Sequence, residues 1–258
     1  MMTTSRFAEN ILLYEFPADP GTHYGYNLYA LLDEQEKTAT LLDAANEPQA
    51  EQVRRDLSAR GYRIARVILS HFHHDHIFGL RELPGVEIVG SPQYEETLAL
   101  LGGKEAGRPF LPTRVVTEDD ELGVGPFRLR FVDAPGHSAC SRYTLIDEDY
   151  VHVGDNLMRS ARGEALFPWV RFEGLVAHID SLERLRAYAD RIILPSHGPA
   201  IRGVAAVHRE IDDRLLVLRA MLESEGEAAY EDIVQGCSQP FLHAEWHRAA
   251  RRRSRRSG

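Results

Sequence analysis

Residues Ser70-His71-Phe72-His73-His74-Asp75-His76 bring four histidines and one aspartate together directly after an apolar segment at 66–69. Neutral imidazole and carboxylate are ligands that suit Zn²⁺, Fe and Mn²⁺. Side chains alternate in an extended segment, so His71 and His73 point to the same side and can reach one metal. Asp75 and His76 follow where the chain turns into the next helix, and they can reach a second metal. Packing these groups together without metal would leave buried polar atoms unpaired.

Three later positions offer the same types of ligand. His137 lies in Ala134-Pro135-Gly136-His137-Ser138, Asp155 in Val153-Gly154-Asp155-Asn156, and His197 in Leu194-Pro195-Ser196-His197-Gly198-Pro199. Each follows an expected strand, on a tight turn that contains glycine or proline. Loops at strand ends share one rim of a scaffold, where sites are usually assembled. These three residues therefore support a site shared with the histidine cluster.

The surrounding pattern predicts a mixed α/β protein. Short β-rich runs come first, and later strands alternate with helices, which fits two sheets with helices outside them. The stretch 102–112 is rich in glycine and proline and is expected to be a loop. Helices are expected between Asn46 and Gly61, at 92–101 and at 175–188. Strands are expected at 11–16, 26–32, 38–43, 66–69, 86–89, 127–132, 141–146, 150–153 and 191–194.

The C-terminal region has a different pattern. Its apolar residues, among them Val207, Ile211 and Leu215, recur at helical spacing on one stripe over 204–222. A second short helix is expected at 228–235. We predict a catalytic domain at 1–203, a helical C-terminal appendage at 204–247 and a basic tail at 248–258. The appendage is expected to pack on the core rather than to form a recognition module, and it is a candidate homodimer surface.

Composition and charge narrow the classes of partner. The 258 residues are 43% apolar and 27% charged, as in globular proteins that bury a sizeable core. The net charge of −9 weighs against nucleic-acid and membrane binding, which depend on a basic surface. The tail at 248–258 contains six arginines and no acid. A disordered, solvated end is the expected structure, and an electrostatic clamp for an anionic partner is the alternative.

Cysteine usage and the N-terminal sequence favour a cytoplasmic protein. Cys140 and Cys237 lie far apart in the sequence and lack metal-ligand spacing, so both are expected to be reduced thiols. The first residues lead into no apolar segment, and no run approaches the ~18 apolar residues of a membrane span. We therefore expect neither a signal peptide nor a transmembrane helix.

The order of the motifs resembles the metallo-β-lactamase superfamily over roughly residues 10–200, and it is most similar to the glyoxalase II-like and broad hydrolase branch. This resemblance implies a four-layer αββα sandwich with metals at one edge. It also implies that Asp43, in Leu41-Leu42-Asp43, supports the metal-binding loop without binding metal itself. The implied ligands are His71, His73 and His137 for the first metal, Asp75, His76 and His197 for the second, and Asp155 bridging both.

The resemblance also implies a reaction. Two divalent metal ions, zinc before iron or manganese, would hold a bridging hydroxide and lower the pKa of its parent water to about 7. We expect hydrolysis of a small-molecule ester, thioester or lactone. Asp155 and Asp75 are the expected catalytic residues: Asp155 orients the hydroxide, and Asp75 passes a proton to the leaving group.

Two alternative functions stay open. One is a persulfide dioxygenase-like oxidoreductase that uses a single iron, which His71, His137 and Asp155 would hold. The other is a metal-dependent nuclease acting on RNA, which fits the arginine-rich tail but not the acidic remainder of the chain.

Exported β-lactamases are disfavoured because no export signal is found. Met158 stands where acyl-homoserine lactonases typically carry a tyrosine, which weakens that assignment.

The other histidines are not expected to bind metal. His74 occupies the variable position of the motif and is interpreted as a loop or supporting residue. His152 lies inside a strand and is interpreted as structural. Histidines on expected helices are interpreted as surface or interface residues, and several residues near the expected site are weak candidates to line a substrate pocket. The helical histidines are His178, His208, His243 and His247; the pocket candidates are His23, Tyr24, Tyr26, Arg159, Phe167, Trp169 and Arg171.

Overall fold

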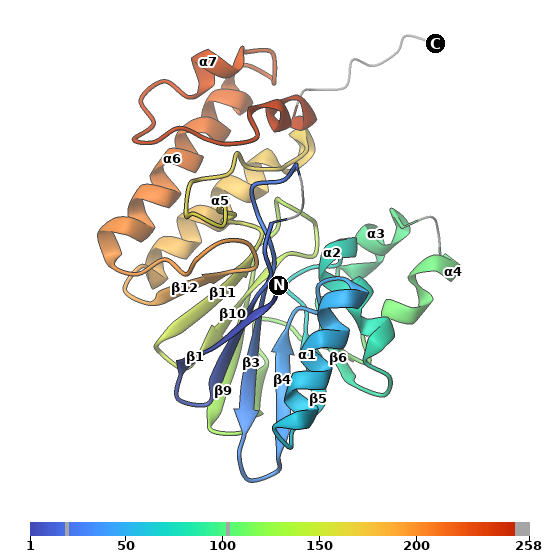
Figure 1. Ribbon diagram of the computed structural model, residues 1–258. Coiled ribbons are helices and arrows are strands. Elements are labelled where there is room, and N and C mark those ends of the chain that lie inside the picture. Colours follow the sequence, from blue (N-terminus) through green and yellow to red (C-terminus); the bar gives the residue numbers. More distant parts are fainter. Residues whose placement is uncertain (19–20, 102–103, 251–258) are drawn as a thin grey trace.

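The computed structural model describes residues 1–18, 21–101 and 104–250, and it contains two β-sheets (Figure 1). The seven-stranded sheet has the order β1-β2-β3-β4-β5-β6-β7, and the five-stranded sheet has the order β12-β11-β10-β9-β8. The first comprises β1 (Thr3–Ala8), β2 (Ile11–Glu15), β3 (Asn27–Asp33), β4 (Thr38–Leu42), β5 (Arg63–Ile68), β6 (Glu87–Gly90) and β7 (Arg114–Val115). The second comprises β8 (Glu121–Val124), β9 (Phe127–Asp133), β10 (Arg142–Ile146), β11 (Tyr150–Gly154) and β12 (Ile192–Pro195).

Helices cover the outer face of each sheet. Helix α1 (Glu47–Ala59) packs on the first sheet, and α5 (Leu175–Leu185) and α6 (Val204–Glu223) pack on the second. The shorter helices are α2 (His74–Ile77), α3 (Tyr94–Ala99), α4 (Lys104–Gly107) and α7 (Tyr230–Ile233). The 3₁₀ helices are η1 (Phe78–Glu82), η2 (Arg108–Phe110), η3 (Phe172–Gly174), η4 (Arg186–Tyr188) and η5 (Ala244–Ala250).

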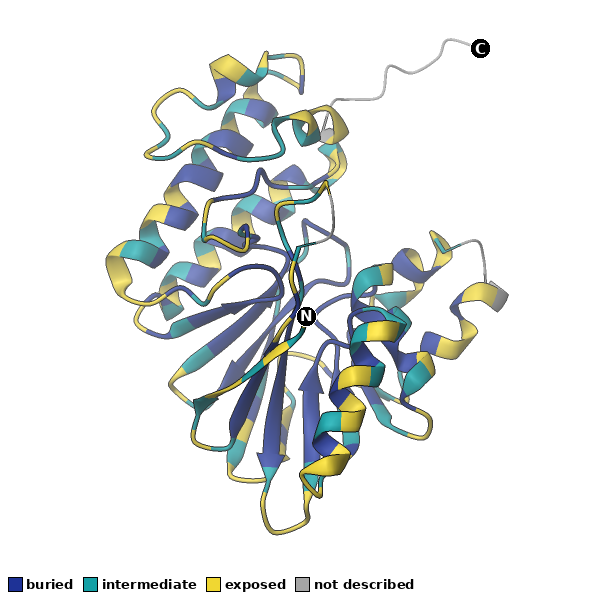
Figure 2. Cartoon of the chain, viewed as in Figure 1, coloured by how far each residue is buried: buried dark blue, intermediate teal, exposed yellow. Residues whose placement is uncertain are grey.

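Alternation along the strands produces the layers. In β2, Leu12 and Tyr14 join a buried cluster with Val53 of α1, whereas Ile11 and Leu13 join the cluster between the two sheets. Successive side chains point to opposite faces of a strand, so an apolar strand supplies two cores at once. Figure 2 shows the consequence, because the strands are largely buried and the helices are exposed on their outer sides. The predicted αββα sandwich is confirmed.

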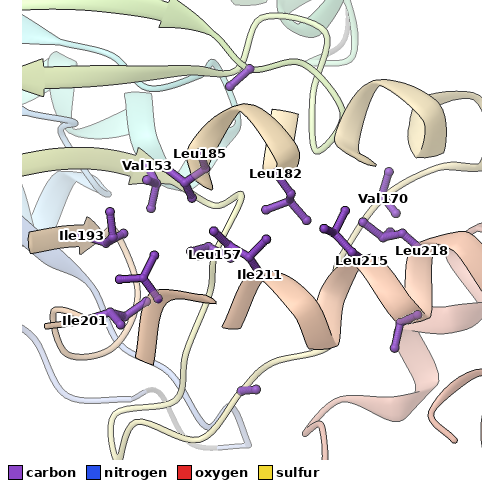
Figure 3. Close-up of a cluster of buried hydrophobic side chains, with 14 of the residues drawn as sticks. Val153, Leu157, Val170, Leu182, Leu185, Ile193, Ile201, Ile211, Leu215 and Leu218 are labelled. Carbon is purple, nitrogen blue, oxygen red and sulfur yellow. The ribbon is translucent and has the colours of Figure 1, made fainter. Parts of the chain in front are cut away.

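Helix α6 is part of the main core. Figure 3 shows Ile211 and Leu215 of α6 beside Leu182 of α5, in a cluster that also includes Val153 of β11 and Ile193 of β12. The apolar stripe predicted over 204–222 therefore packs on the second sheet through α5, as expected. The division of the chain at 203/204 stays a prediction. The tail predicted to be disordered falls largely on 251–258, outside the described residues.

Most predicted elements are present with shifted ends. The stretch 102–112, expected to be a loop, includes α4 and η2, and the helix expected at 228–235 is the short α7. Strand β1 was not predicted, because it lies at a sheet edge and its exposed residues lack apolar alternation. Within the described residues, no helix is long and apolar enough to span a membrane.

Strand direction determines where the loops meet. Strands β4 and β5 are parallel, and so are β11 and β12. Strand β9 is antiparallel to β10, which is antiparallel to β11, so β9, β11 and β12 end at the same edge. The loops after β4, β5, β9, β11 and β12 carry Asp43, the histidine cluster and the three later ligand candidates. One edge of the sandwich therefore collects all of the predicted chemistry.

Candidate metal centre

The structure brings together all seven side chains that were predicted to bind metal. They form two groups, and within each group the potential ligand atoms lie within 4.8 Å of one another. His74 belongs to neither group, and its side chain is 66% exposed, as expected for a histidine that is not a ligand. The first group contains His71, His73 and His137, and the second contains Asp75, His76, Asp155 and His197.

The first group consists of three converging imidazoles. His71 Nε2 lies 3.0 Å from His73 Nδ1, and His137 Nε2 lies 2.9 Å from the same atom. The rings meet nearly edge to face. His73 therefore presents Nδ1, whereas its two neighbours present Nε2.

Asp155 lies between the two groups. Its carboxylate oxygens lie 3.3 Å from Nε2 of His76 and 3.3 Å from Nε2 of His197. The same carboxylate lies 3.5 Å from His137 Nε2 in the first group. Asp75 completes the second group, with Oδ2 3.8 Å from His76 Nε2 and 3.7 Å from His197 Nε2. One carboxylate is thus within reach of both groups.

Hydrogen bonds to backbone carbonyls determine which ring nitrogen carries the proton in two of these histidines. His137 Nδ1 donates to the carbonyl oxygen of Trp169 at 2.9 Å, and His197 Nδ1 donates to that of Gly25 at 2.7 Å. A carbonyl oxygen can only accept, so the proton of each neutral ring is on Nδ1 and Nε2 carries a lone pair. Both lone pairs face the centre, as a metal ligand requires.

Asp43 fixes two more rings from behind the centre. Its carboxylate accepts hydrogen bonds from Ser70 N at 2.7 Å, Ser70 Oγ at 2.8 Å, Ser196 Oγ at 2.9 Å and His76 Nδ1 at 2.8 Å. Because Ser70 Oγ donates to Asp43, it accepts from His71 Nδ1 at 3.0 Å. In their neutral form both histidines therefore direct Nε2 lone pairs inward, and Asp43 occupies the supporting position that the resemblance implied.

Charge and burial act in opposite directions within the centre. Burial, with a smaller contribution from the neighbouring His137, lowers the pKa of His73 to about 2. Burial raises the pKa of Asp155, but His76 and His197 outweigh that effect and hold it well below its usual value. Burial lowers the pKa of His76, yet the carboxylates of Asp155 and Asp43 raise it well above its usual value. The acidic surroundings thus favour a positive charge at the centre, which protons or a metal ion can supply.

The donor set fits divalent metal ions. His76 Nε2, His197 Nε2 and Asp155 Oδ1 are buried and have no hydrogen-bond partner among the described residues. Leaving such groups unpaired in the interior is costly. Imidazole and carboxylate ligands in two adjacent groups, with their ring orientations fixed from behind, would satisfy these atoms by coordination. The His/Asp clusters therefore indicate a divalent metal site.

Glycines allow the ligand loops to turn tightly. A Cβ on Gly154, where φ is +54°, would lie 2.6 Å from Ser70 Oγ. A Cβ on Gly136, where φ is +140°, would lie 2.4 Å from His178 Cα, and one on Gly198, where φ is +81°, would lie 2.6 Å from backbone oxygens. These three glycines are close to Asp155, His137 and His197 in sequence, so the close approach of backbone segments positions the ligands.

A cavity of about 430 Å³ opens beside the first group. Its walls include His73, His137, Trp169, Arg171 and Leu100, so two predicted pocket residues line it. The Trp169 ring lies 5.7 Å from the rings of both histidines. The cavity therefore provides room for a substrate next to the candidate metal ligands.

The other pocket candidates have different surroundings. The rings of Tyr24 and Tyr26 lie 4.9 and 5.3 Å from the His197 ring. Phe167 is buried in the core, and Arg159 lies 3.4 Å from the carboxylate of Glu210, so neither lines the cavity beside the first group.

Two histidines were placed wrongly from the sequence, and one of them is His243, which was expected on a helix but lies before η5 with φ of +59°. His178 was expected at a surface or interface, but it is 1% exposed and packs under Gly136. Its Nε2 donates to the carbonyl oxygen of Asn156 at 3.4 Å. Helical periodicity could have indicated this, because Leu175, His178 and Leu185 lie on the buried face of α5. The histidine therefore supports the turn that carries His137.

Several supporting groups were not identified from the sequence. The hydroxyls of Ser70 and Ser196 on Asp43 had no motif of their own, and the carbonyls of Trp169 and Gly25 carry no side-chain signal. His152, interpreted as structural, is buried with Nε2 3.2 Å from Ser196 Oγ. These groups connect the ligands to the folded interior.

Curated proteins similar in sequence share one printed name. A hydroxyacylglutathione hydrolase of Actinobacillus pleuropneumoniae serotype 5b (strain L20) is 26% identical over 192 residues, which cover 70% of this chain and 74% of that protein. A hydroxyacylglutathione hydrolase of Brucella anthropi is 32% identical over 160 residues, which cover 60% of this chain and 54% of that protein. The second match therefore spans about half of the relative.

Solved structures and a family model give the same assignment. A metallo-beta-lactamase from Pontibacter korlensis superposes with a TM-score of 0.69 at 15% identity, covering 83% of this chain and 99% of that one. This likeness shows the fold. The model of the metallo-beta-lactamase superfamily matches residues 24–197, which include all seven candidate ligands. The chain therefore belongs to the metallo-beta-lactamase superfamily and is an enzyme of the metallo-hydrolase class.

Proposed function

We propose that this enzyme hydrolyses an acyl thioester, or a related small-molecule ester or lactone, with two divalent metal ions, zinc being the first choice. The observation that carries the proposal is the position of Asp155 between two groups of inward-facing ligand atoms. When bound, two such cations supply a hydroxide nucleophile at neutral pH and polarise the substrate carbonyl.

Two sites account for the ligands better than one. His71, His73 and His137 would hold one cation, and Asp75, His76 and His197 would hold the other, with Asp155 shared. A single site would leave the second group as buried acceptors without a partner, at a cost in stability.

The chain's own residues have separable roles in this reaction. Asp155 is placed to orient the attacking nucleophile, because its oxygens face both ligand groups. Asp75 is less buried, with its side chain 17% exposed, and its Oδ2 lies beside His197. It can hold the proton that the departing sulfur or oxygen requires.

The cavity and the similar curated proteins support the proposed substrate class. The cavity beside His73 and His137 is lined by Trp169 and Leu100 and can take a small acyl group. The similar curated proteins are named hydroxyacylglutathione hydrolases, which supports a thioester as the first choice. A carbonyl at the centre with its acyl group in this cavity would present its departing group on the opposite side, toward His197.

Metal analysis combined with a substrate panel tests the proposal. Protein purified without added metal is analysed by elemental mass spectrometry and assayed with 2-hydroxyacyl thioesters, esters and lactones. About two metal ions per chain and thioester hydrolysis that a chelator abolishes are expected. One iron per chain with oxygen consumption on a persulfide, or cleavage of RNA without cleavage of any ester, would overturn it.

A further inference from the structure

An aromatic cluster lies beside the second ligand group, whose members do not line the cavity. Tyr24 contacts the His197 ring, and the Trp246 ring lies 5.9 Å from Tyr24 at 74°. His243 stacks on Trp246, with ring centroids 4.4 Å apart and planes at 13°. Residues separated by more than 200 positions thus form one surface, in which the C-terminal segment lies beside the loop between β2 and β3 (Figure 1).

Hydrogen bonds hold the C-terminal segment in this position. Leu242 N donates to the carbonyl of Ala165, and Phe167 N donates to the carbonyl of Leu242, both at 2.9 Å. The chain then turns at His243, a non-glycine residue with φ of +59°. A left-handed conformation at such a residue costs free energy and persists where the surrounding contacts compensate. The segment is therefore anchored to the loop that follows Asp155.

Two consecutive hydrogen bonds fix the orientation of the His243 ring. His243 Nδ1 donates to the Glu245 carboxylate at 2.9 Å, so its Nε2 is free to accept from His23 Nδ1 at 3.3 Å. His23 belongs to the loop between β2 and β3, and its carbonyl accepts a hydrogen bond from Ala161 N at 2.9 Å. Both partners of the contact are thus held by further hydrogen bonds, and the Tyr24–Trp246 pair is preorganised.

We infer that Tyr24 and Trp246 form the wall that binds the departing group of the substrate and that they select an apolar, flat group. The inference rests on the proposed function, because it needs a hydrolysed bond at the centre. Tyr24 lies against the ring of His197, which belongs to the second ligand group, and no residue of that group lines the acyl cavity. The acyl cavity is on the other side, beside Trp169, so the departing group meets the Tyr24–Trp246 wall.

Two thioesters of one acid test this assignment. The S-benzyl and S-(2-sulfoethyl) thioesters of lactic acid share the acyl group and differ only in the departing thiol. Trp246→Ala is expected to raise KM for the benzyl ester about tenfold, since an aromatic contact and its buried area are lost. KM for the sulfoethyl ester should change less than about twofold, and Trp246→Phe should retain most of the benzyl preference.

The other tryptophan provides the matched control. The chain has two tryptophans, and Trp169 lies on the acyl side. Trp169→Phe should change KM for both esters by the same factor, because the acyl group is common to them. An unchanged benzyl preference in Trp246→Ala, with thioester hydrolysis intact and metal content as in the wild type, would overturn the inference and leave the proposed function standing.

A binding measurement separates the two claims. In Trp169→Phe, Trp246 is the single tryptophan, and its fluorescence should change saturably on addition of benzyl methyl sulfide, which carries the benzylthio group without an acyl group. If no thioester is hydrolysed but this saturable change is present, the proposed function fails and the binding wall is supported. If the fluorescence does not change although the benzyl ester is hydrolysed, the wall is refuted.

Discussion

His76 Nδ1 donates a hydrogen bond of 2.8 Å to the carboxylate of Asp43, and both side chains are almost fully buried. The same carboxylate also accepts from Ser70 and Ser196, so a single group behind the centre connects ligand-bearing loops of both sheets. Asp43 has φ of +61°, a conformation that an aspartate tolerates better than most residues. The orientation of the candidate ligands therefore depends on a residue that does not belong to either ligand group.

Replacement of Asp43 by asparagine tests this dependence. The amide would place an NH₂ group against donors from Ser70, Ser196 and His76, and one or more of these hydrogen bonds would be lost. Affinity for added zinc should fall about 10- to 100-fold, as is typical when partners of metal ligands are removed. Competition with a chromophoric chelator measures the affinity. Asp56→Asn, a change in α1 remote from the seven candidate ligands, is the control and should bind zinc as the wild type does.

Asp155→Ala tests the shared carboxylate. Loss of a group that only supports a metal ligand lowers metal affinity or activity about 10- to 100-fold. Loss of a ligand within reach of both groups should therefore lower kcat/KM about 100-fold or more. The fold should survive, because burying this carboxylate carries its own desolvation cost. Circular dichroism, metal content and thioester turnover are measured on the same sample. Asp190→Ala changes an exposed aspartate and should leave all three unchanged. Near-normal turnover by metal-free Asp155→Ala would refute the proposed mechanism.

The sequence predicted which candidate ligands meet at the centre, but it did not predict the aromatic cluster beside them. His71, His73 and His76 share one strand end, so alternation and spacing were sufficient to place them together. The order of strands and helices indicated two sheets with helices outside them, and the family resemblance implied the αββα arrangement of these layers. Trp246 could not be placed beside Tyr24, because nothing in 204–250 encodes the turn at His243 that directs the segment toward the centre.

Gly154→Ala tests the close approach behind Asp155. The added Cβ would lie 2.6 Å from Ser70 Oγ at a φ of +54°, so Ser70 or the turn must move. The free energy of unfolding of the metal-free protein should fall by about 1–3 kcal/mol, the usual cost of backbone strain at such a position. Urea denaturation measures this change. At Gly123 a Cβ would meet no atom within 4 Å, and Gly123→Ala should cost less than about 1 kcal/mol. Equal losses in the two variants would contradict the steric explanation.

A buried ion pair in α6 leads to a prediction about pH. Glu210 and Arg214 are 3% and 1% exposed, with side-chain atoms 2.6 Å apart, and Arg214 also donates to the carbonyl of Met158 at 2.7 Å. Burial raises the pKa of Glu210, but Arg214 and Arg159 outweigh it and hold that pKa below the usual value of 4.5. A carboxylate with a lowered pKa in the folded state stabilises the fold above pH 4.5, and this contribution is lost as pH falls through the folded-state pKa.

Glu210→Gln should remove that contribution. The variant leaves the buried Arg214 without its counter-charge, so the free energy of unfolding at pH 7 should fall by about 3 kcal/mol or more. Because glutamine does not titrate, the difference from the wild type should shrink as pH falls below 4.5, toward the lowered folded-state pKa. Urea denaturation measures both effects when it is repeated from about pH 3.5 to 7 in steps of about 0.5 pH unit, a range that brackets the pKa of Glu210 in the unfolded chain. Glu223→Gln, an exposed position on the same helix, is the control and should follow the wild-type curve. A difference that stays constant over the whole pH range would show that Glu210 contributes by packing and not by its charge.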